Sequence, residues 1–186
     1  FADIKMDGLA CSLIYQDGVL ETAVTRGDSY IGEDITSNAR TIKSIPLKLS
    51  SFIKQTDFLL AGRTEVRGEI VMLKKDFDAL NKMQRKNKEP EFANPRNLAA
   101  GTIRQLDPSL VASRPLQFRA YDLIYENSAL IPSNNLAYTF LTEIGFIRNK
   151  EIGVFENTTK LIDFINIWNE KRNDLPFNTD GVAIKI

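Results

Sequence analysis

Residues 4–8, Ile4-Lys5-Met6-Asp7-Gly8, place a lysine and an acid in a short alternating run near the start of the chain. Ile4 and Met6 are apolar and alternate with Lys5 and Asp7, which is the period of a half-buried β-strand. In such a strand Lys5 and Asp7 point to the same face, one pleat apart. A lysine amine can attack phosphorus and hold a nucleotide as a phosphoramidate, so this stretch suggests a covalent nucleophile.

The segments that follow predict a mixture of strands and helices. Residues 9–15 and 19–25 are strand-like, and Asp17-Gly18 between them is a hairpin turn signal. Further strands are expected at 65–72, 116–125 and 180–186, and helices at 35–42, 76–88, 95–104, 134–144 and 158–172. Strand hairpins mixed with helices predict an α+β fold with mainly antiparallel sheets. No repeat, low-complexity segment or linker divides residues 1–186, so we expect one domain.

Single residues sharpen some of these elements. Asn94 is expected to cap a helix that starts at Pro95, because proline is best tolerated at the first helical position. In the helix at 76–88, Phe77, Leu80 and Met83 are expected on one side. In the helix at 158–172, four apolar residues follow the i, i+3, i+4, i+7 spacing of one helix face and are expected to lie in the core: Leu161, Phe164, Ile165 and Trp168.

Composition narrows the possible functions. The chain has 186 residues, of which 43% are hydrophobic, and its 24 basic residues balance its 24 acidic residues. Dedicated non-specific DNA binders are strongly basic, so any contact with nucleic acid is expected through a local patch. The chain has no histidine, which excludes Ser-His-Asp and Cys-His catalysis within it. Cys11 is its one cysteine, so an internal disulfide and a Cys-rich zinc site are excluded, and Cys11 is expected to be a small core residue.

Several short motifs accompany Lys5-Met6-Asp7-Gly8 along the chain. They are Thr25-Arg26-Gly27-Asp28, Gly32-Glu33-Asp34-Ile35-Thr36, Glu65-Val66-Arg67-Gly68-Glu69, Asn94-Pro95-Arg96-Asn97, Arg104-Gln105-Leu106-Asp107-Pro108 and Asp180-Gly181-Val182-Ala183-Ile184-Lys185. With these motifs the chain resembles, from Lys5 to Lys185, the adenylylation (nucleotidyltransferase) domain of bacterial NAD-dependent DNA ligases. The Lys-x-Asp-Gly element is shared with ATP-dependent ligases and mRNA capping enzymes, whereas the motifs after Thr25, Gly32 and Asn94 are particular to the NAD-dependent branch.

The resemblance implies a fold and a reaction. The fold is two mainly antiparallel β-sheets flanked by helices, with the nucleotide between the sheets. The reaction consumes NAD as the AMP donor with Mg²⁺: a lysine takes AMP and releases nicotinamide mononucleotide, AMP passes to the 5′-phosphate of a nick in double-stranded DNA, and the 3′-hydroxyl then displaces AMP. A location in the bacterial cytoplasm follows from the family. No apolar run approaches the ~20 residues of a membrane span.

The resemblance also implies parts that this chain does not contain. The first residue is not Met, and we expect the chain to be incomplete at both ends. A subdomain that grips the nicotinamide end is expected before Phe1. A last lysine motif, an OB domain, a zinc module and helix-hairpin-helix repeats are expected after the present end, so zinc is expected only there. The isolated chain is therefore expected to hold an adenosine pocket and to be impaired in the full reaction.

Residue roles follow from the matched motifs. Lys5 is the nucleophile, Asp7 orients it or holds metal, and Arg26 contacts the nucleotide. A free lysine, with a pKa of ~10.4, is neutral in about one molecule in a thousand near pH 7, so activation requires burial or nearby positive charge. Arg26, Lys185 and bound magnesium are the expected sources of that charge. The alternative for Lys5 is a surface lysine paired with Asp7.

Three further positions are expected around the adenosine. Glu69 corresponds to the family's carboxylate on the ribose hydroxyl, and Tyr121 to its adenine-stacking aromatic, with Phe118 as the competing candidate. Glu65 and Arg67 are expected to be ordinary polar partners on the same strand. Asp3 stands where the family usually has glutamate as an adenine contact; because its side chain is shorter, that contact is expected through backbone or water.

The last set concerns phosphate and metal. Arg96 and Arg104 match arginines near the adenylate and the nick phosphate, and about two helical turns between them place both on one face. Lys185 corresponds to a lysine that engages the AMP, and Asp180 to a carboxylate near the metal. A second basic group, Lys82, Arg85, Lys86 and Lys88, is interpreted as a solvated helix face, with DNA contact as the alternative.

Other nucleotide schemes do not fit. Gly27 and Gly32 have the spacing of a phosphate-binding P-loop, but Glu33 follows where lysine is required. No Gly-x-Gly-x-x-Gly is present, so NAD is expected to be consumed rather than used for hydride transfer. Two alternatives stay open: an adenosine-nucleotide-binding module without turnover, and an ATP-dependent ligase or capping-type nucleotidyltransferase.

Overall fold

The computed structural model describes residues 1–27 and 32–185 and confirms the three strands expected at the start of the chain. They are β1 (Ala2–Met6), β2 (Leu9–Gln16) and β3 (Val19–Thr25). Asp17 and Gly18 have φ angles of 50° and 74°, and two consecutive positive φ values are typical of the tight turn that matches strand twist. Asp28, the last residue of the motif that begins at Thr25, and Ile186, the end of the strand expected at 180–186, lie outside the described residues.

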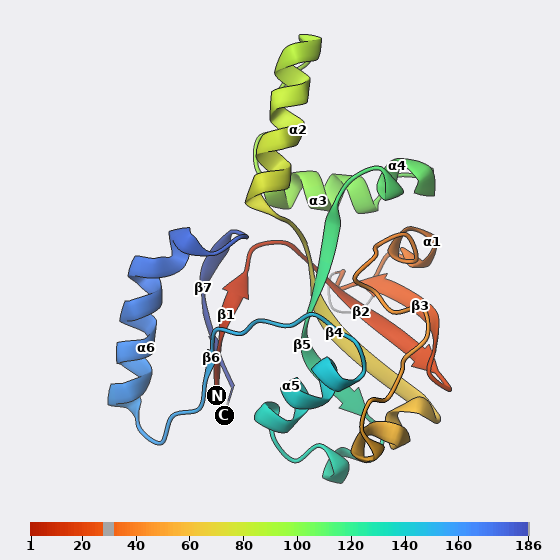
Figure 1. Ribbon diagram of the computed structural model, residues 1–186, viewed down its shortest axis with the longest axis vertical. Helices are drawn as coiled ribbons and strands as arrows, with labels where there is room; N and C mark the ends of the chain where they lie inside the picture. The colour runs from red at the N-terminus through yellow and green to blue at the C-terminus, as the bar shows by residue number, and fades with distance from the viewer. Residues whose placement is uncertain (28–31, 186) are drawn as a thin grey trace.

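Two antiparallel sheets form the centre of the molecule (Figure 1). The larger has the order β3-β2-β4-β5, with β4 at Arg63–Met72 and β5 at Leu116–Tyr125. The smaller has the order β6-β1-β7, with β6 at Ile152–Gly153 and β7 at Thr179–Ile184. The predicted α+β fold with two mainly antiparallel sheets is confirmed.

The chain crosses from the small sheet to the large sheet at Asp7-Gly8. β1 is the central strand of the small sheet, and β2, which begins at Leu9, belongs to the large one. A Cβ atom at Gly8 would lie 2.3 Å from the carbonyl oxygen of Ile70 on β4. Only glycine allows the backbone of the crossing to approach β4 this closely. The motif that begins at Lys5 is therefore also the junction of the two sheets.

Helices flank the sheets. They are α1 (Thr36–Ala39), α2 (Lys74–Asn87), α3 (Pro95–Ile103), α4 (Pro108–Ala112), α5 (Asn134–Glu143) and α6 (Thr158–Lys171), with short 3₁₀ turns at Lys54–Leu60, Ser128–Leu130 and Arg172–Asp174. The cap of α3 is as predicted: the Asn94 side chain accepts a hydrogen bond from the Asn97 amide at 2.7 Å, and Pro95 is the first helical residue. The helix expected at 35–42 is shorter, because after Ala39 the chain closes 3₁₀-type bonds such as Ile42 N to Ala39 O.

The main core lies between the large sheet and α1, α3, α4 and α5, and it contains Cys11 as predicted. A smaller cluster contains Ile4 and Met6 of β1 and Val71 of β4, so it links the two sheets. The predicted apolar face of α6 packs on this cluster through Phe164 and Trp168, but its residues are only half-buried, since a three-stranded sheet offers little surface to cover.

Only part of the apolar side of helix α2 lies in the core. Phe77 and Leu80 pack against the core, but Met83 is 59% exposed. Figure 1 shows why: α2 projects from the body, and its second half extends beyond the packed layers. Within residues 1–27 and 32–185, no helix is long and apolar enough to cross a membrane.

Candidate active site

A cavity of about 590 Å³ lies between the two sheets and brings most of the predicted site residues together. Strand alternation explains how: β1 buries Ile4 and Met6 and turns Lys5 the other way, and β4 buries Gly68 and Ile70 and turns Glu69 the other way. The predicted residues that line the cavity are Asp3, Lys5, Arg26, Glu69, Arg96, Arg104, Tyr121 and Lys185. Asp7 and Asp180 are joined to this wall by ion pairs.

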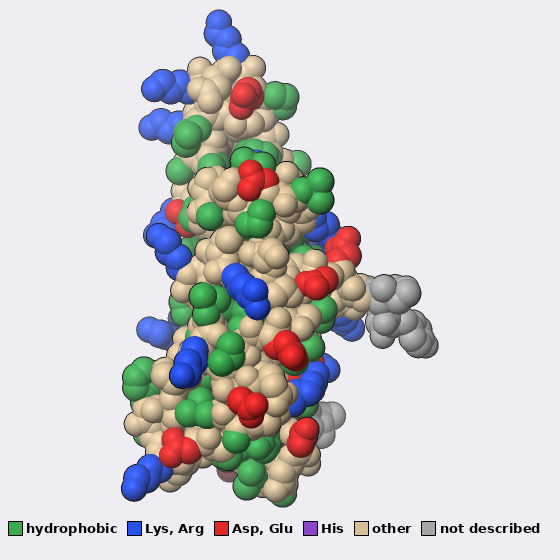
Figure 2. Space-filling view, turned by 90° about the vertical axis from the view of Figure 1, so that its right-hand side faces the viewer, with side chains coloured by type: hydrophobic (Ala, Val, Ile, Leu, Met, Phe, Trp, Pro, Cys, Tyr) green, Lys and Arg blue, Asp and Glu red, His purple; other side chains and the backbone are tan. Residues whose placement is uncertain are grey.

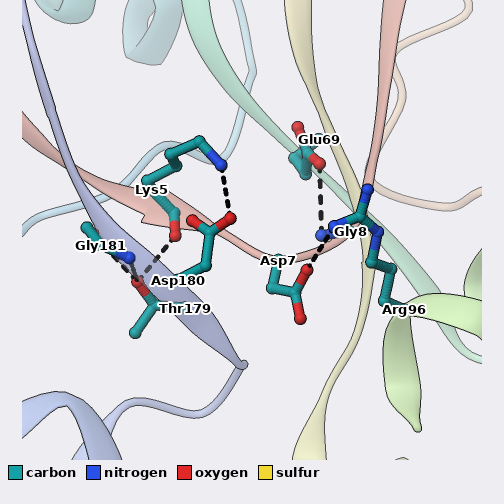
Figure 3. A network of polar contacts seen from close by, with 8 residues as sticks. All are labelled: Lys5, Asp7, Gly8, Glu69, Arg96, Thr179, Asp180 and Gly181. Carbon is teal, nitrogen blue, oxygen red and sulfur yellow. Dashed lines mark hydrogen bonds and ion pairs between the residues drawn. The ribbon is translucent and has the colours of Figure 1, made fainter.

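Lys5 forms an ion pair with Asp180, as Figure 3 shows. Its Nζ atom donates to Asp180 Oδ2 at 2.6 Å, and the antiparallel pairing of β1 with β7 sets Lys5 opposite Gly181. Both side chains are about half exposed, at 56% and 42%. Such exposed pairs contribute roughly 0.2–1 kcal/mol to stability, so this pair is weak enough to be exchanged when a ligand binds.

Asp7 does not contact Lys5. β1 ends at Met6 with a register irregularity after Lys5, so the regular pleat that would align Lys5 with Asp7 is interrupted. The Asp7 carboxylate instead accepts a hydrogen bond from Arg96 Nη1 at 3.0 Å, from the first turn of α3 (Figure 3). The surface pairing of Lys5 with Asp7 that the sequence left open is therefore not formed.

Glu69 faces the cavity from β4. Its Oε1 atom accepts a hydrogen bond from the Gly8 amide at 3.2 Å, which ties β4 to the crossing segment. Burial raises the pKa of Glu69 to about 7, although the Gly8 amide and the charges of Lys5 and Arg96 lower it in part. The same strand confirms the expectation for Glu65 and Arg67, which form an ion pair at 2.8 Å.

Alternation along β5 separates the two aromatic candidates. Phe118 is fully buried in the main core beside Gly68, whereas Tyr121 is half-buried and lines the cavity. Burial raises the pKa of Tyr121 to about 12, so its ring is neutral and its phenol protonated near pH 7. Lys185 lies beside it: Nζ donates to the Tyr121 carbonyl oxygen at 2.8 Å and lies 3.4 Å from Asp122 Oδ1.

Arginines supply positive charge to the cavity. Arg96 lies in the first turn of α3 and Arg104 caps its end, and both line the cavity, as their spacing predicted. Arg104 Nε donates to Glu33 Oε2 at 2.5 Å, and Arg26 reaches the same space from the end of β3. Glu33 lines the cavity but was given no role from the sequence, although it lies in the quoted motif Gly32-Glu33-Asp34.

Comparison with known proteins agrees with this geometry. A family model described as the NAD-dependent DNA ligase adenylation domain matches residues 1–186. The chain belongs to this family. Proteins named DNA ligase from Oceanobacillus iheyensis, Syntrophomonas wolfei and Natranaerobius thermophilus are 46%, 41% and 44% identical to it over 185 residues. These alignments cover 99%, 100% and 100% of the chain but 26%, 27% and 26% of the relatives, so this adenylation domain spans about a quarter of their length.

Asp3 lines the cavity of the adenylation domain, but its carboxylate is already bonded. The hydroxyl of Tyr138 donates to one oxygen, and Asn149 Nδ2 donates to the other at 3.0 Å. Burial raises the pKa of Asp3, and these two hydrogen bonds lower it in part. Tyr138 and Asn149 thus hold the carboxylate in place, and the expectation that any contact to adenine runs through backbone or water stays a prediction.

Asn149 links the two sheets of the adenylation domain. Its Nδ2 atom donates to Asp3 and to the Ile4 carbonyl oxygen at 3.1 Å, both on β1, and its Oδ1 atom accepts from Arg119 Nε of β5 at 3.2 Å. Asn149 is fully buried, and each of its polar atoms has a partner. Unsatisfied buried amides cost about 1–3 kcal/mol, so this arrangement holds β1 at a defined distance from β5.

The acidic residues fit a magnesium site only in part. Among the residues that the structure describes, no three acidic or cysteine side chains form a group that could hold a metal ion by themselves. Mg²⁺ usually binds through one or two carboxylates, substrate phosphates and water, so a complete protein cage is not required. Asp180, next to Lys5, is placed for such a role, with the ammonium of Lys5 now at the carboxylate.

Proposed function

We propose that this chain performs the lysine adenylylation step of an NAD-dependent DNA ligase. Lys5 Nζ attacks the α-phosphorus of NAD, a P–N bond forms, the P–O bond to nicotinamide mononucleotide breaks, and AMP stays on Lys5. One observation carries the proposal: Lys5, Glu69 and Tyr121 come from three different strands and meet in one cavity. A volume of about 590 Å³ lies within the range of small-ligand sites, about 300–1,000 Å³.

The cavity offers side chains suited to the base, the ribose and the phosphates of the nucleotide. Tyr121 offers a ring for stacking on the base, and Glu69 an acceptor for ribose hydroxyls. Arg26, Arg96 and Lys185 offer positive charge for the phosphates. Arg96 is oriented by Asp7, which gives Asp7 a positioning role in place of direct contact with Lys5.

The amine has to lose a proton before it attacks. As an ion pair with Asp180, the Lys5 ammonium has no free electron pair, and Asp180 Oδ2 at 2.6 Å is the neighbouring base that can take the proton. The arginines that line the cavity then stabilise the charge that develops on the phosphoryl oxygens. When bound, Mg²⁺ would supply further charge neutralisation at those oxygens, held by substrate phosphates and water; Asp180 would ligate it only while ionised, before it accepts the Lys5 proton.

We propose the later steps by analogy with the family and with the relatives named DNA ligase. AMP passes from Lys5 to the 5′-phosphate of nicked double-stranded DNA, and the 3′-hydroxyl displaces AMP to seal the strand. Arg104, bonded to Glu33 at the cavity wall, is proposed to contact the nick phosphate. We place the reaction in the bacterial cytoplasm, with the nicotinamide-gripping subdomain, the last lysine motif and the DNA-binding and zinc modules outside this chain.

The test is the intact mass after incubation with NAD and Mg²⁺. The chain is tested alone and joined to the N-terminal subdomain of a DNA ligase, as wild type, as Lys5→Ala and as the control Lys43→Ala, an exposed lysine far along the chain. The joined form should gain the mass of one AMP in the wild type and in the control. The gain should vanish in Lys5→Ala. An AMP adduct that persists in Lys5→Ala would show that Lys5 is not the nucleophile.

Two alternatives have their own outcomes. A module that only binds adenosine nucleotides is favoured by the chain's span of about a quarter of its relatives, and it predicts binding of AMP without a mass gain in either form. An ATP-dependent ligase or capping-type enzyme predicts labelling by ATP and not by NAD. Labelling by NAD alone would support the proposed function against both.

A further inference from the structure

Residues 74–94, the α2 finger, leave the cavity wall and return to it. Glu69 of β4 lies in the wall before the finger, and Arg96 of α3 lies in the wall after it. α2 has 14 residues, which corresponds to a length of about 21 Å. Its base is fixed where Lys74 bonds the backbone of Asn173 and Pro176, and Figure 1 shows the rest of the helix standing away from the sheets.

One side of α2 is covered by the finger's own return segment. Asn81 exchanges hydrogen bonds with the backbone of Phe92 at 3.1 and 2.8 Å. Further along the helix, Gln84 bonds the Pro90 carbonyl oxygen, and Arg85 forms an ion pair with Glu91 at 2.5 Å. Glu91 of the return segment is thus paired with Arg85.

Another side of α2 carries lysines in a row. Lys75, Lys82 and Lys86 are seven and four residues apart, so at 100° per residue they fall within about 40° of one another around the helix. All three are exposed, and no ion pair to them occurs within residues 1–27 and 32–185. Asp78 lies next to this row without pairing to it in the same ranges. In Figure 2 the basic side chains of the projecting helix gather along one edge of it.

The length of the lysine row allows it to follow several phosphates of one DNA strand. From Lys75 to Lys86 it extends about 16 Å, and one strand of B-DNA carries a phosphate every ~3.4 Å along the axis. Lysine ammonium groups on flexible stems bind phosphates as point charges and read no sequence, which is suitable for a protein that acts at any nick. In a chain with no net charge, such a row supplies the local attraction that composition as a whole does not.

We propose that the Lys75–Lys82–Lys86 row of the α2 finger contacts the phosphate backbone of the DNA duplex beside the nick. This rests on the proposed function, because the nick has to reach the cavity between Glu69 and Arg96, where both ends of the finger are attached. The contact positions duplex DNA and takes no part in the transfer of AMP from NAD to Lys5.

The experiment compares two triple variants with the same loss of charge. One is Lys75→Ala/Lys82→Ala/Lys86→Ala, and the control is Lys43→Ala/Lys48→Ala/Lys54→Ala, three exposed lysines outside the finger. Alanine is the best helix former, so α2 is retained, and far-UV circular dichroism checks it. Binding of the chain to a nicked duplex is measured by fluorescence anisotropy between about 20 and 200 mM NaCl, and AMP transfer to Lys5 is measured without DNA in the joined form described above.

Each lost phosphate contact should reduce the slope of log K against log salt by about 0.9. The finger variant should therefore lose up to about 2.7 from this slope, while the control keeps the wild-type slope and both keep wild-type AMP transfer. Equal slopes in the finger variant and the wild type, or an equal loss in both variants, would overturn the proposal. So would a wild-type chain without salt-dependent binding. A loss of AMP transfer in all proteins would instead count against the proposed function.

Discussion

Glu69→Gln should make the protein more stable at alkaline pH and leave its stability unchanged in acid. Glu69 lies in the cavity wall, where burial raises its pKa from the ordinary value of 4.5 to about 7. At 1.36 kcal/mol per pH unit, this difference corresponds to about 3 kcal/mol of unfolding free energy. Glutamine keeps the shape of the side chain and an oxygen that can accept the Gly8 amide, but it has no charge to bury.

The sign follows from the number of protons that each state binds. Between pH 4.5 and about 7 the unfolded chain has lost the proton of Glu69 and the folded chain still holds it. Folding therefore binds a proton in this range, and the unfolding free energy of the wild type falls as pH rises. Above about pH 7 the loss is complete, so Glu69→Gln should exceed the wild type there by about 3 kcal/mol.

Urea unfolding at about pH 4 and about pH 8 measures this difference. The other titrating groups are common to both proteins and cancel when the two unfolding free energies are subtracted. Glu126→Gln, which removes the same carboxyl from an exposed position, is the control and should differ from the wild type by less than about 0.5 kcal/mol at both pH values. A Glu69→Gln effect that is the same at both pH values would refute the reasoning that Glu69 is a desolvated carboxyl.

Three further substitution tests follow from the contacts. Tyr121→Ala should weaken binding of adenosine compounds about 5- to 150-fold in a calorimetric titration, since stacking contributes ~1–3 kcal/mol. Phe118→Ala should instead lower the unfolding free energy by about 3–5 kcal/mol. Loss of binding in Phe118→Ala together with loss of stability in Tyr121→Ala would contradict the cavity geometry. Asp180→Asn should change stability by no more than about 1 kcal/mol but slow AMP transfer about 10²- to 10⁴-fold in a mass-spectrometric time course, and an unchanged rate would exclude it as the proton acceptor. Gly8→Ala should destabilise the chain by about 1–3 kcal/mol or more. Gly101→Ala lies inside α3, where a Cβ meets nothing within 4 Å, and should stabilise the chain by about 0.5–1 kcal/mol. Thermal unfolding of both variants measures the two effects, and equal effects would argue against a close backbone contact at Gly8.

Local signals in the sequence predicted most of the elements. Two positive-φ residues formed the expected turn at Asp17-Gly18, and Asn94-Pro95 began α3 as expected, because caps and turns depend on neighbours in the chain. The order of the strands had no such signal. β1 pairs with β7, which is far along the chain, and not with β2, from which only two residues separate it. Such pairing depends on long-range packing, which periodicity does not report.

The candidate site shows the same division. The resemblance named the residues of the cavity wall, but it did not give their partners: Lys5 with Asp180, Asp7 with Arg96, and Arg104 with Glu33. These ion pairs join positions at least 71 residues apart. The exposure of Met83 could not be predicted for a related reason, since the helical period shows which side of α2 is apolar but not where the body beneath it ends.

The position of Asn149 has a consequence for how the proposed activity can change. Lys5, the proposed nucleophile, and Tyr121, the proposed stacking ring, belong to separate sheets, and this buried amide spans the gap through Asp3, Ile4 and Arg119. A substitution there would alter the separation of nucleophile and phosphorus while each half of the pocket kept its own side chains. Under the proposed function, the rate of AMP transfer would then change separately from nucleotide affinity, through a residue whose side-chain partners are all protein groups.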